Sequence, residues 1–103
     1  MVAEFGVIPI GAGTSVSRYL VKVVDLVAKS GLDYRVGSMG TVVEGSWEQV
    51  FGLIKRCHQA VLKDVDRVWL HVSVDDRKDH KGKGRIDGKV RSIEEKLGRS
   101  LKK

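Results

Sequence analysis

Residues 41–62 read TVVEGSWEQVFGLIKRCHQAVL, a short apolar strand that runs directly into a helix. Ser46 and Gln49 have the spacing of a capping box, in which each side chain accepts a hydrogen bond from the other residue's backbone N–H. Glu48 adds a negative charge to the positive first turn of the helix. The apolar residues that follow recur at helical spacing and predict one buried stripe: Val50, Leu53, Ile54, Cys57, Val61 and Leu62.

The chain before this segment predicts another strand followed by another helix. Val2–Ile10 is rich in β-branched and apolar residues on both alternating faces, which is typical of a central strand covered on two sides. Pro9 suggests a bulge or the end of that strand, because proline donates no ladder hydrogen bond. Thr14 or Ser15 is expected to cap a helix that runs to about Ser30.

Three further elements complete the order. A short strand is expected near residues 33–38, just before the strand at 41–44. Arg67–Asp75 alternates apolar and polar side chains, as in a strand with one face on the core. A third helix is predicted by apolar residues at helical spacing before Gly98, which ends it: Ile86, Val90, Ile93 and Leu97.

The resulting order, βαββαβα, predicts a single α/β (α+β) domain over residues 1–103. Right-handed crossovers place the first and third strands in the middle of the sheet and the second and fourth at its edges. This is a ferredoxin-like βαββαβ sandwich with an added C-terminal helix. Both main helices then cover one face of the sheet, and the other face carries Ile8, Trp69 and His71. An uncovered apolar face indicates a protein partner, most simply a second copy in a homo-oligomer, a dimer or tetramer through the sheet.

Composition narrows the class of protein. The single cysteine excludes an internal disulfide and suits a reducing compartment. The N-terminus does not resemble a signal peptide and no apolar run approaches the roughly 20 residues of a membrane span, so a cytoplasmic location without membrane contact is expected. Residues 77–103 hold 11 of the 19 Lys and Arg but only 4 of the 13 Asp and Glu. This basic segment either meets nucleic acid or an acidic partner, or is a solvated helix face.

The residue pattern matches no known catalytic, metal-binding or nucleotide-binding motif. Cys57 and His58 are neighbours on a helix and point about 100° apart, so they do not form a nucleophile–base pair. Three histidines and one cysteine at scattered spacings match no zinc motif, and we expect no metal, no cofactor and no enzymatic activity. The Gly11–Ser15 turn matches neither a Walker loop nor a Rossmann fingerprint, and is either a plain connection or a turn that contacts a ligand.

Glu44 is the unexpected residue, because carboxylates are disfavoured in strands. It lies between glycines and close to Trp47. It is either an exposed residue at the end of the strand or a carboxylate that lines a pocket between the third strand and the second helix.

An RNA-recognition domain shares the βαββαβ order but needs aromatic residues on its third strand to stack bases. Residues 41–44 contain none, which argues against that class.

The string Gly40-Thr41-Val42-Val43-Glu44-Gly45-Ser46-Trp47 resembles the small thiamine-binding protein family related to YkoF. Further matching pieces are spread over nearly the whole chain: Pro9-Ile10-Gly11, Ser15-Val16-Ser17, Cys57-His58, 75–79 and 89–97.

The resemblance implies a ferredoxin-like fold, dimers and tetramers, and non-enzymatic binding of thiamine or its hydroxymethylpyrimidine part. The ligand contacts that the resemblance implies centre on Thr41 and Glu44. With the residues near them, the implied ligand-binding set is Thr41, Glu44, Gly40, Met39, Ser15, Ser17 and Trp47. An aminopyrimidine offers N–H donors to a carboxylate, and a thiazolium cation favours anionic and aromatic surroundings. Two other functions stay open: a nucleic-acid-binding module that uses the basic C-terminal segment, and a structural or regulatory oligomeric subunit.

Overall fold

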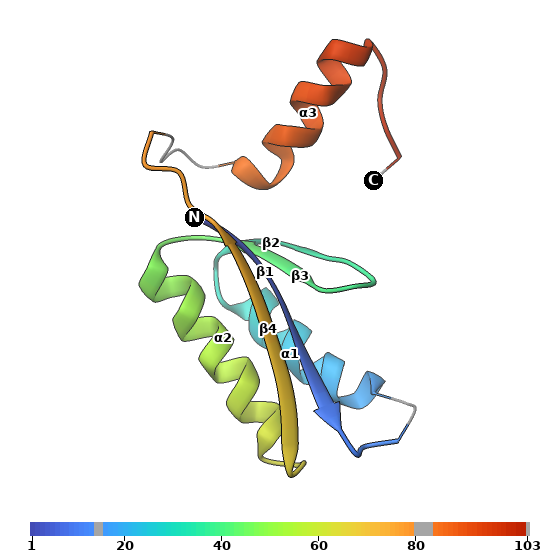
Figure 1. The fold of residues 1–103 in the computed structure, drawn as a ribbon, viewed down its shortest axis with the longest axis vertical. Coiled ribbons are helices and arrows are strands. Elements are labelled where there is room, and N and C mark those ends of the chain that lie inside the picture. Colours follow the sequence, from blue (N-terminus) through green and yellow to red (C-terminus); the bar gives the residue numbers. More distant parts are fainter. Residues whose placement is uncertain (14–15, 80–83, 103) are drawn as a thin grey trace.

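The computed structural model describes residues 1–13, 16–79 and 84–102, which form a four-stranded sheet and three helices (Figure 1). The elements follow the expected order: β1 (Val2–Ile10), α1 (Ser17–Lys29), β2 (Asp33–Val36), β3 (Thr41–Glu44), α2 (Trp47–Leu62), β4 (Arg67–Asp75) and α3 (Arg85–Leu97).

The sheet is antiparallel throughout, with the strand order β2-β3-β1-β4. The predicted ferredoxin-like topology, with the first and third strands in the middle, is therefore confirmed. β1 pairs with β4 along its full length, but only residues 2–5 of β1 pair with β3. Pro9 lies in the part of β1 that has a partner on one side only, one residue before the strand ends. A missing N–H is tolerated there without a bulge.

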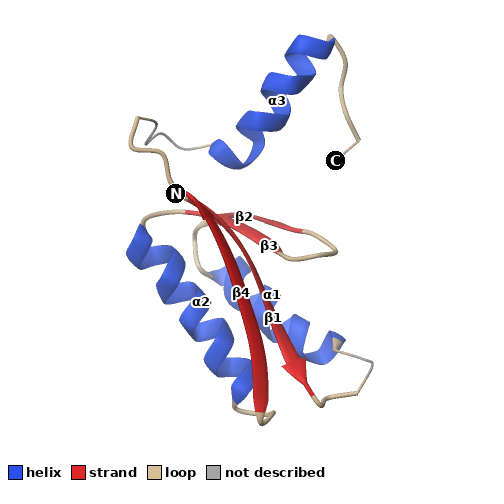
Figure 2. Cartoon of the chain, in the orientation of Figure 1, coloured by secondary structure: helices blue, strands red, loops and turns tan. Residues whose placement is uncertain are grey.

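The core lies between one face of the sheet and the helices α1 and α2 (Figure 2). The predicted buried stripe on α2 is wrong at Leu62, which lies at the end of the helix and is 40% exposed. Val74 on β4 is also 40% exposed. The helices cover β1 and β3 fully and the edge strand β4 only in part. The buried apolar residues are Ala3, Phe5, Val7, Tyr19, Val23, Val27, Val43, Val50, Leu53, Ile54, Cys57 and Val61.

The helix starts differ in how well the sequence predicted them. The capping box of α2 is present, with Ser46 and Gln49 each accepting from the other's backbone N–H. For α1, the predicted cap at Thr14 or Ser15 falls on two residues outside the described part of the chain. The residue at the N-cap of α1 is Val16, which has no side-chain oxygen to offer. The cap prediction there was wrong because the helix starts one or two residues later than expected.

Helix α3 stands beyond the end of the sheet at which β1 begins and β4 ends (Figure 1). It is bounded by Gly84 and Gly98, both in the left-handed conformation that glycine adopts without steric cost. None of its 13 residues is buried, and Ile93 and Leu97 of its apolar stripe are exposed. No helix in the described ranges is long and apolar enough to cross a membrane.

The outer face of the sheet carries the predicted apolar residues. Ile8 pairs with Trp69 and Gly6 pairs with His71, so these four residues share the face opposite Phe5. A side chain at position 6 would come within 2.4 Å of the His71 ring, so the ring lies over the glycine. Trp69 is 63% exposed.

Cys57 is buried in the core, where its thiol contacts the backbone oxygen of Val23 at 3.9 Å. Burial raises the pKa of this thiol to about 11. At neutral pH the residue is therefore a protonated, apolar core group and not a nucleophile.

Leu53 and Leu62 provide a matched test of the core. Leu53 is fully buried on α2, and Leu62 lies exposed at the end of the same helix. Leu53→Ala should lower the free energy of unfolding by about 2–5 kcal/mol, because it leaves a cavity. Leu62→Ala should lower it by less than about 1 kcal/mol. Urea denaturation measures both, and equal losses would contradict the described core.

Candidate functional site

A cleft of about 1110 Å³ opens at the end of the sheet where β1 begins. Its walls come from the end of β3, the start of α2, the start of β2, the segment after β4 and the start of α3. This volume is slightly above the roughly 300–1,000 Å³ that is typical of small-molecule pockets. The lining residues are Met1, Gly31, Leu32, Asp33, Glu44, Gly45, Ser46, Trp47, Gln49, Asp76, Arg77, Lys78, Gly84 and Arg85.

Glu44 joins the sheet to α3. Its Oε1 accepts hydrogen bonds from the backbone N–H groups of Arg85 and Ile86, at 2.9 and 3.3 Å. These are the first two residues of α3, whose own N-cap, Gly84, has no side chain to cap the helix. The carboxylate of a distant strand therefore satisfies two N–H groups that a helix start leaves open, and its charge suits the positive end of the helix dipole.

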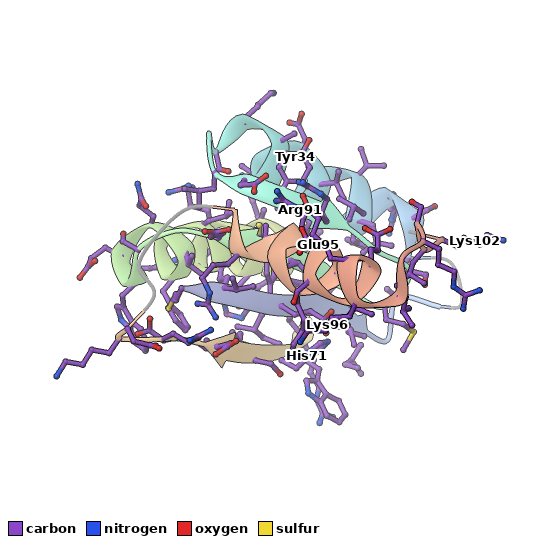
Figure 3. The ribbon with its side chains drawn as sticks, turned by 90° about the horizontal axis from the view of Figure 1, so that it is seen from above. Tyr34, His71, Arg91, Glu95, Lys96 and Lys102 are labelled. Atoms are coloured by element: carbon purple, nitrogen blue, oxygen red, sulfur yellow. The ribbon has the colours of Figure 1, made fainter. Side chains whose placement is uncertain are left out.

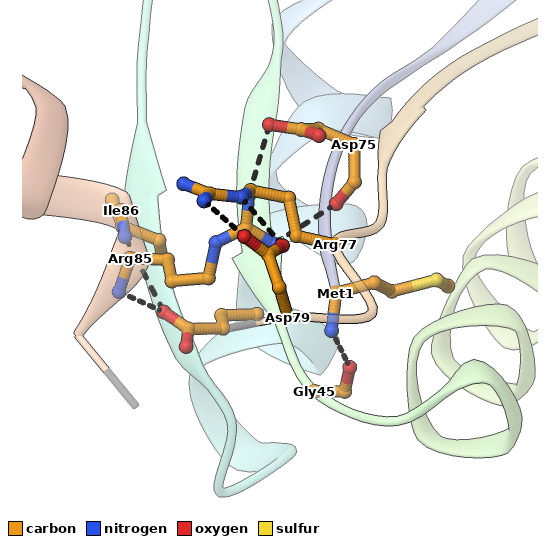
Figure 4. A network of polar contacts seen from close by, with 8 residues as sticks. Met1, Gly45, Asp75, Arg77, Asp79, Arg85 and Ile86 are labelled. Atoms are coloured by element: carbon orange, nitrogen blue, oxygen red, sulfur yellow. Dashed lines mark hydrogen bonds and ion pairs between the residues drawn. The ribbon is translucent and has the colours of Figure 1, made fainter. Parts of the chain in front are cut away.

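Further polar contacts hold the rim of the cleft (Figure 4). The Arg85 guanidinium, whose side chain is only 10% exposed, donates to the Asp75 carboxylate at 2.9 Å and to the Asp75 backbone oxygen at 3.2 Å. Arg77 donates to Asp79 at 2.8 and 3.2 Å. The N-terminal amino group of Met1 donates to the backbone oxygen of Gly45 at 2.7 Å. The start of β1, the end of β3 and the start of α3 are thus tied together at one place.

Trp47 supplies an aromatic surface to the cleft. It is the first residue of α2, three positions after Glu44, and it is 59% exposed. Its ring packs on the Phe51 ring one turn further along the helix, with the ring centroids 4.5 Å apart and the planes at 33°. This contact restrains the Trp47 ring and leaves much of its surface open to a ligand.

Charges of both signs line the cleft. Asp33, Glu44 and Asp76 oppose Arg77, Lys78 and Arg85, and the N-terminal amino group of Met1 adds one further positive charge. In the ranges that the structure describes, no group of three His, Cys, Asp or Glu side chains could hold a metal ion.

The structure brings two of the predicted ligand residues, Glu44 and Trp47, together in the cleft. Thr41 is buried on the helix-covered face of β3, opposite the face of Glu44 and roughly 10 Å further along the strand. Met39, 85% exposed, and Gly40 belong to the turn between β2 and β3, at the other end of β3.

The two predicted serines belong to the region around the start of α1. Ser17 is the first residue of α1 and follows the end of β1, roughly 30 Å of strand away from the cleft at the start of β1. Ser15 lies outside the described residues. The preceding turn has Gly11 and Gly13 at φ angles of +82° and +86°.

Sequence reasoning missed Arg77 and Arg85 as cleft residues, and Asp75 as the partner that holds the Arg85 side chain. The apolar stripe that begins at Ile86 did predict a helix here. Nothing local showed that this helix lacks its own cap, or that a carboxylate 41 residues earlier supplies one.

These features define a ferredoxin-like domain with an open cleft that a carboxylate and an aromatic ring both line. The chain belongs to the thiamine-binding protein family. The sequence model described as "Thiamine-binding protein" matches residues 3–94.

Individual relatives agree with this assignment. The UPF0045 protein MJ1052 of Methanocaldococcus jannaschii is 39% identical over 95 residues, which cover 92% of this chain and 93% of the relative. Its crystal structure superimposes with a TM-score of 0.82 over 91% of this chain and 95% of that one. The UPF0045 protein YqgV of Bacillus subtilis is 31% identical over 102 residues, covering 93% and 96% of the two chains.

A more distant structure shares the fold. Protein TM0486 of Thermotoga maritima, whose name provisionally assigns it to thiamine biosynthesis or salvage, has a TM-score of 0.76 at 20% identity. The match covers 89% of this chain and 96% of that one.

The contact between Glu44 and α3 predicts a difference between two substitutions. Glu44→Ala removes the acceptor of two helix-start N–H groups and should speed amide hydrogen exchange at Arg85 and Ile86 by about 10- to 100-fold, since a charge-assisted hydrogen bond contributes about 1.5–3 kcal/mol. Glu44→Gln keeps an oxygen acceptor and should retain most of the protection. Exchange resolved by NMR measures both variants. Unchanged protection in Glu44→Ala would show that Glu44 does not cap α3.

Proposed function

We propose that this protein is a non-enzymatic binding protein for thiamine or its hydroxymethylpyrimidine part, which it sequesters, delivers or senses. Its membership of the thiamine-binding family supports the ligand class. The observation that carries the proposal is the cleft in which Glu44 and Trp47 lie three residues apart, at the junction of β3 and α2.

The chemistry of thiamine suits these two residues. Its aminopyrimidine donates N–H groups that a carboxylate oxygen accepts, and its thiazolium carries a positive charge that is attracted to an aromatic face and to a carboxylate. Glu44 gives one oxygen to α3, and a carboxylate has a second oxygen for a ligand. Thr41, Met39, Gly40, Ser15 and Ser17 stay proposals that rest on the family resemblance alone.

The second part of the proposal is that the protein is a cytoplasmic homo-oligomer assembled through the outer face of its sheet. Ile8 and Trp69 lie exposed on that face, and α3 has an apolar stripe in which Ile93 and Leu97 are exposed. A second copy of the chain can cover the outer sheet face, as symmetric oligomers commonly do.

Glu44→Gln tests the ligand site. The substitution keeps the size and the cap of α3 but removes the negative charge, so thiamine binding should weaken by about 10- to 100-fold, at 1.4 kcal/mol per decade. Calorimetric titration with thiamine and with hydroxymethylpyrimidine measures the change. Glu48→Gln is the matched control, because Glu48 is exposed on the first turn of α2 and does not line the cleft.

Two outcomes would contradict this function. Equal thiamine affinities of the wild type and Glu44→Gln would remove Glu44 from the site, and no binding by the wild type would reject the thiamine assignment.

An oligonucleotide in the same titrations addresses the nucleic-acid alternative, which the exposed Arg91 and Lys96 of α3 favour (Figure 3). Tight oligonucleotide binding that survives physiological salt would support that alternative, because purely electrostatic binding fades as salt rises.

Trp69→Asp tests the assembly. Light scattering of the wild type at micromolar concentration should give a multiple of the 11.4-kDa chain mass, and Trp69→Asp should lower it, because the substitution puts a charge into the interface. Val21→Asp is the control, because Val21 is similarly exposed, at 68%, but lies on α1, away from the outer sheet face. A wild-type mass of 11.4 kDa would reject the oligomer.

A further inference from the structure

Helix α3 depends on its first turn for its position. It has 13 residues and none is buried, and a helix of that length is marginal in water without tertiary contacts. Three strands hold the first turn: Glu44 of β3 accepts from two of its N–H groups, Asp75 of β4 binds the Arg85 side chain, and Arg35 of β2 forms an ion pair with Asp87.

The same first turn forms part of the cleft wall. Gly84 and Arg85 line the cleft together with Glu44, whereas the rest of α3 does not. Within the described ranges, both hydrogen bonds of the Glu44 carboxylate use Oε1. The first turn of α3 and a ligand in the cleft can therefore bind the same Glu44 carboxylate, each through a different oxygen.

We propose that docking of α3 and binding of the ligand are positively coupled through Glu44, so that α3 is a lid whose closure the ligand stabilises. The inference rests on the proposed function. A ligand bound to Oε2 holds the carboxylate in the position that caps α3, and docked α3 supplies the wall formed by Gly84 and Arg85. Coupling between the docking of α3 and the binding of the ligand is reciprocal. A change that loosens α3 therefore also lowers the affinity for the ligand.

Gly88 offers a matched pair of variants. It lies in α3 outside the wall of this cleft, and a Cβ built there meets nothing within 4 Å. Gly88→Pro interrupts the helix and should weaken thiamine binding by about 5- to 100-fold, the usual range of a coupling between sites. Gly88→Ala favours the helix and should bind thiamine as tightly as the wild type or more tightly. Calorimetric titration of the full-length variants compares the three proteins.

The reciprocal effect is measured in the wild type. Saturating thiamine should slow amide hydrogen exchange at residues 90–97 by about 5-fold or more, although none of these residues lines the cleft. This measurement needs no substitution, so it decides the question even if Gly88→Pro misfolds.

The outcomes separate this inference from the proposed function. If the wild type does not bind thiamine, both are rejected. If the wild type binds thiamine but exchange at residues 90–97 is unchanged and Gly88→Pro binds equally well, the proposed function stands and the coupling is rejected.

Discussion

The inner row of β1 is the constraint on which the rest of the domain depends. Ala3, Phe5 and Val7 are all buried, and both covering helices and the neighbouring strands pack around them. Because side chains alternate along a strand, burying this row sends Glu4, Gly6 and Ile8 to the other face. The two-layer core and the uncovered outer face are therefore consequences of one strand and its period of two.

The same geometry places the cleft. β1 begins beside the end of β3, because the two strands are antiparallel and Val2 pairs with Glu44. β3 runs through a single glycine and the Ser46 cap into α2, which sets Trp47 three residues after Glu44. β4 finishes at the same end of the sheet, where Asp75 pairs with Val2. Three chain segments thus meet where α3 starts, and their polar ends line one cleft.

Glu44 caps α3 and also lines the cleft, so a structural role and the proposed binding role meet at one side chain. Two interpretations were open from the sequence, a strand-end residue beside a helix cap and a pocket carboxylate. The structure has it half-buried in a cleft wall and, at the same time, capping a helix that the sequence did not connect with it. A carboxylate has enough acceptor positions for both tasks, which is why the two interpretations do not exclude each other.

Much of this architecture follows from local patterns in the sequence. The alternation in Arg67–Asp75 and the capping box at Ser46 and Gln49 determined β4 and the start of α2, because strand faces and helix caps depend on residues a few positions apart. The crossover rule then determined the strand order. The string from Gly40 to Trp47 also carried the family resemblance that the comparisons confirmed.

Other features depend on contacts between residues far apart in the chain, and only the tertiary structure decided them. The cap of α3 comes from Glu44, and the Arg85 guanidinium binds Asp75 across the rim of the cleft. Leu62 and Val74 fit an apolar pattern but are exposed, because the two covering helices do not reach the end of α2 or the edge of β4. A periodic pattern reports which side of an element is apolar, whereas burial depends on what the rest of the chain places against that side.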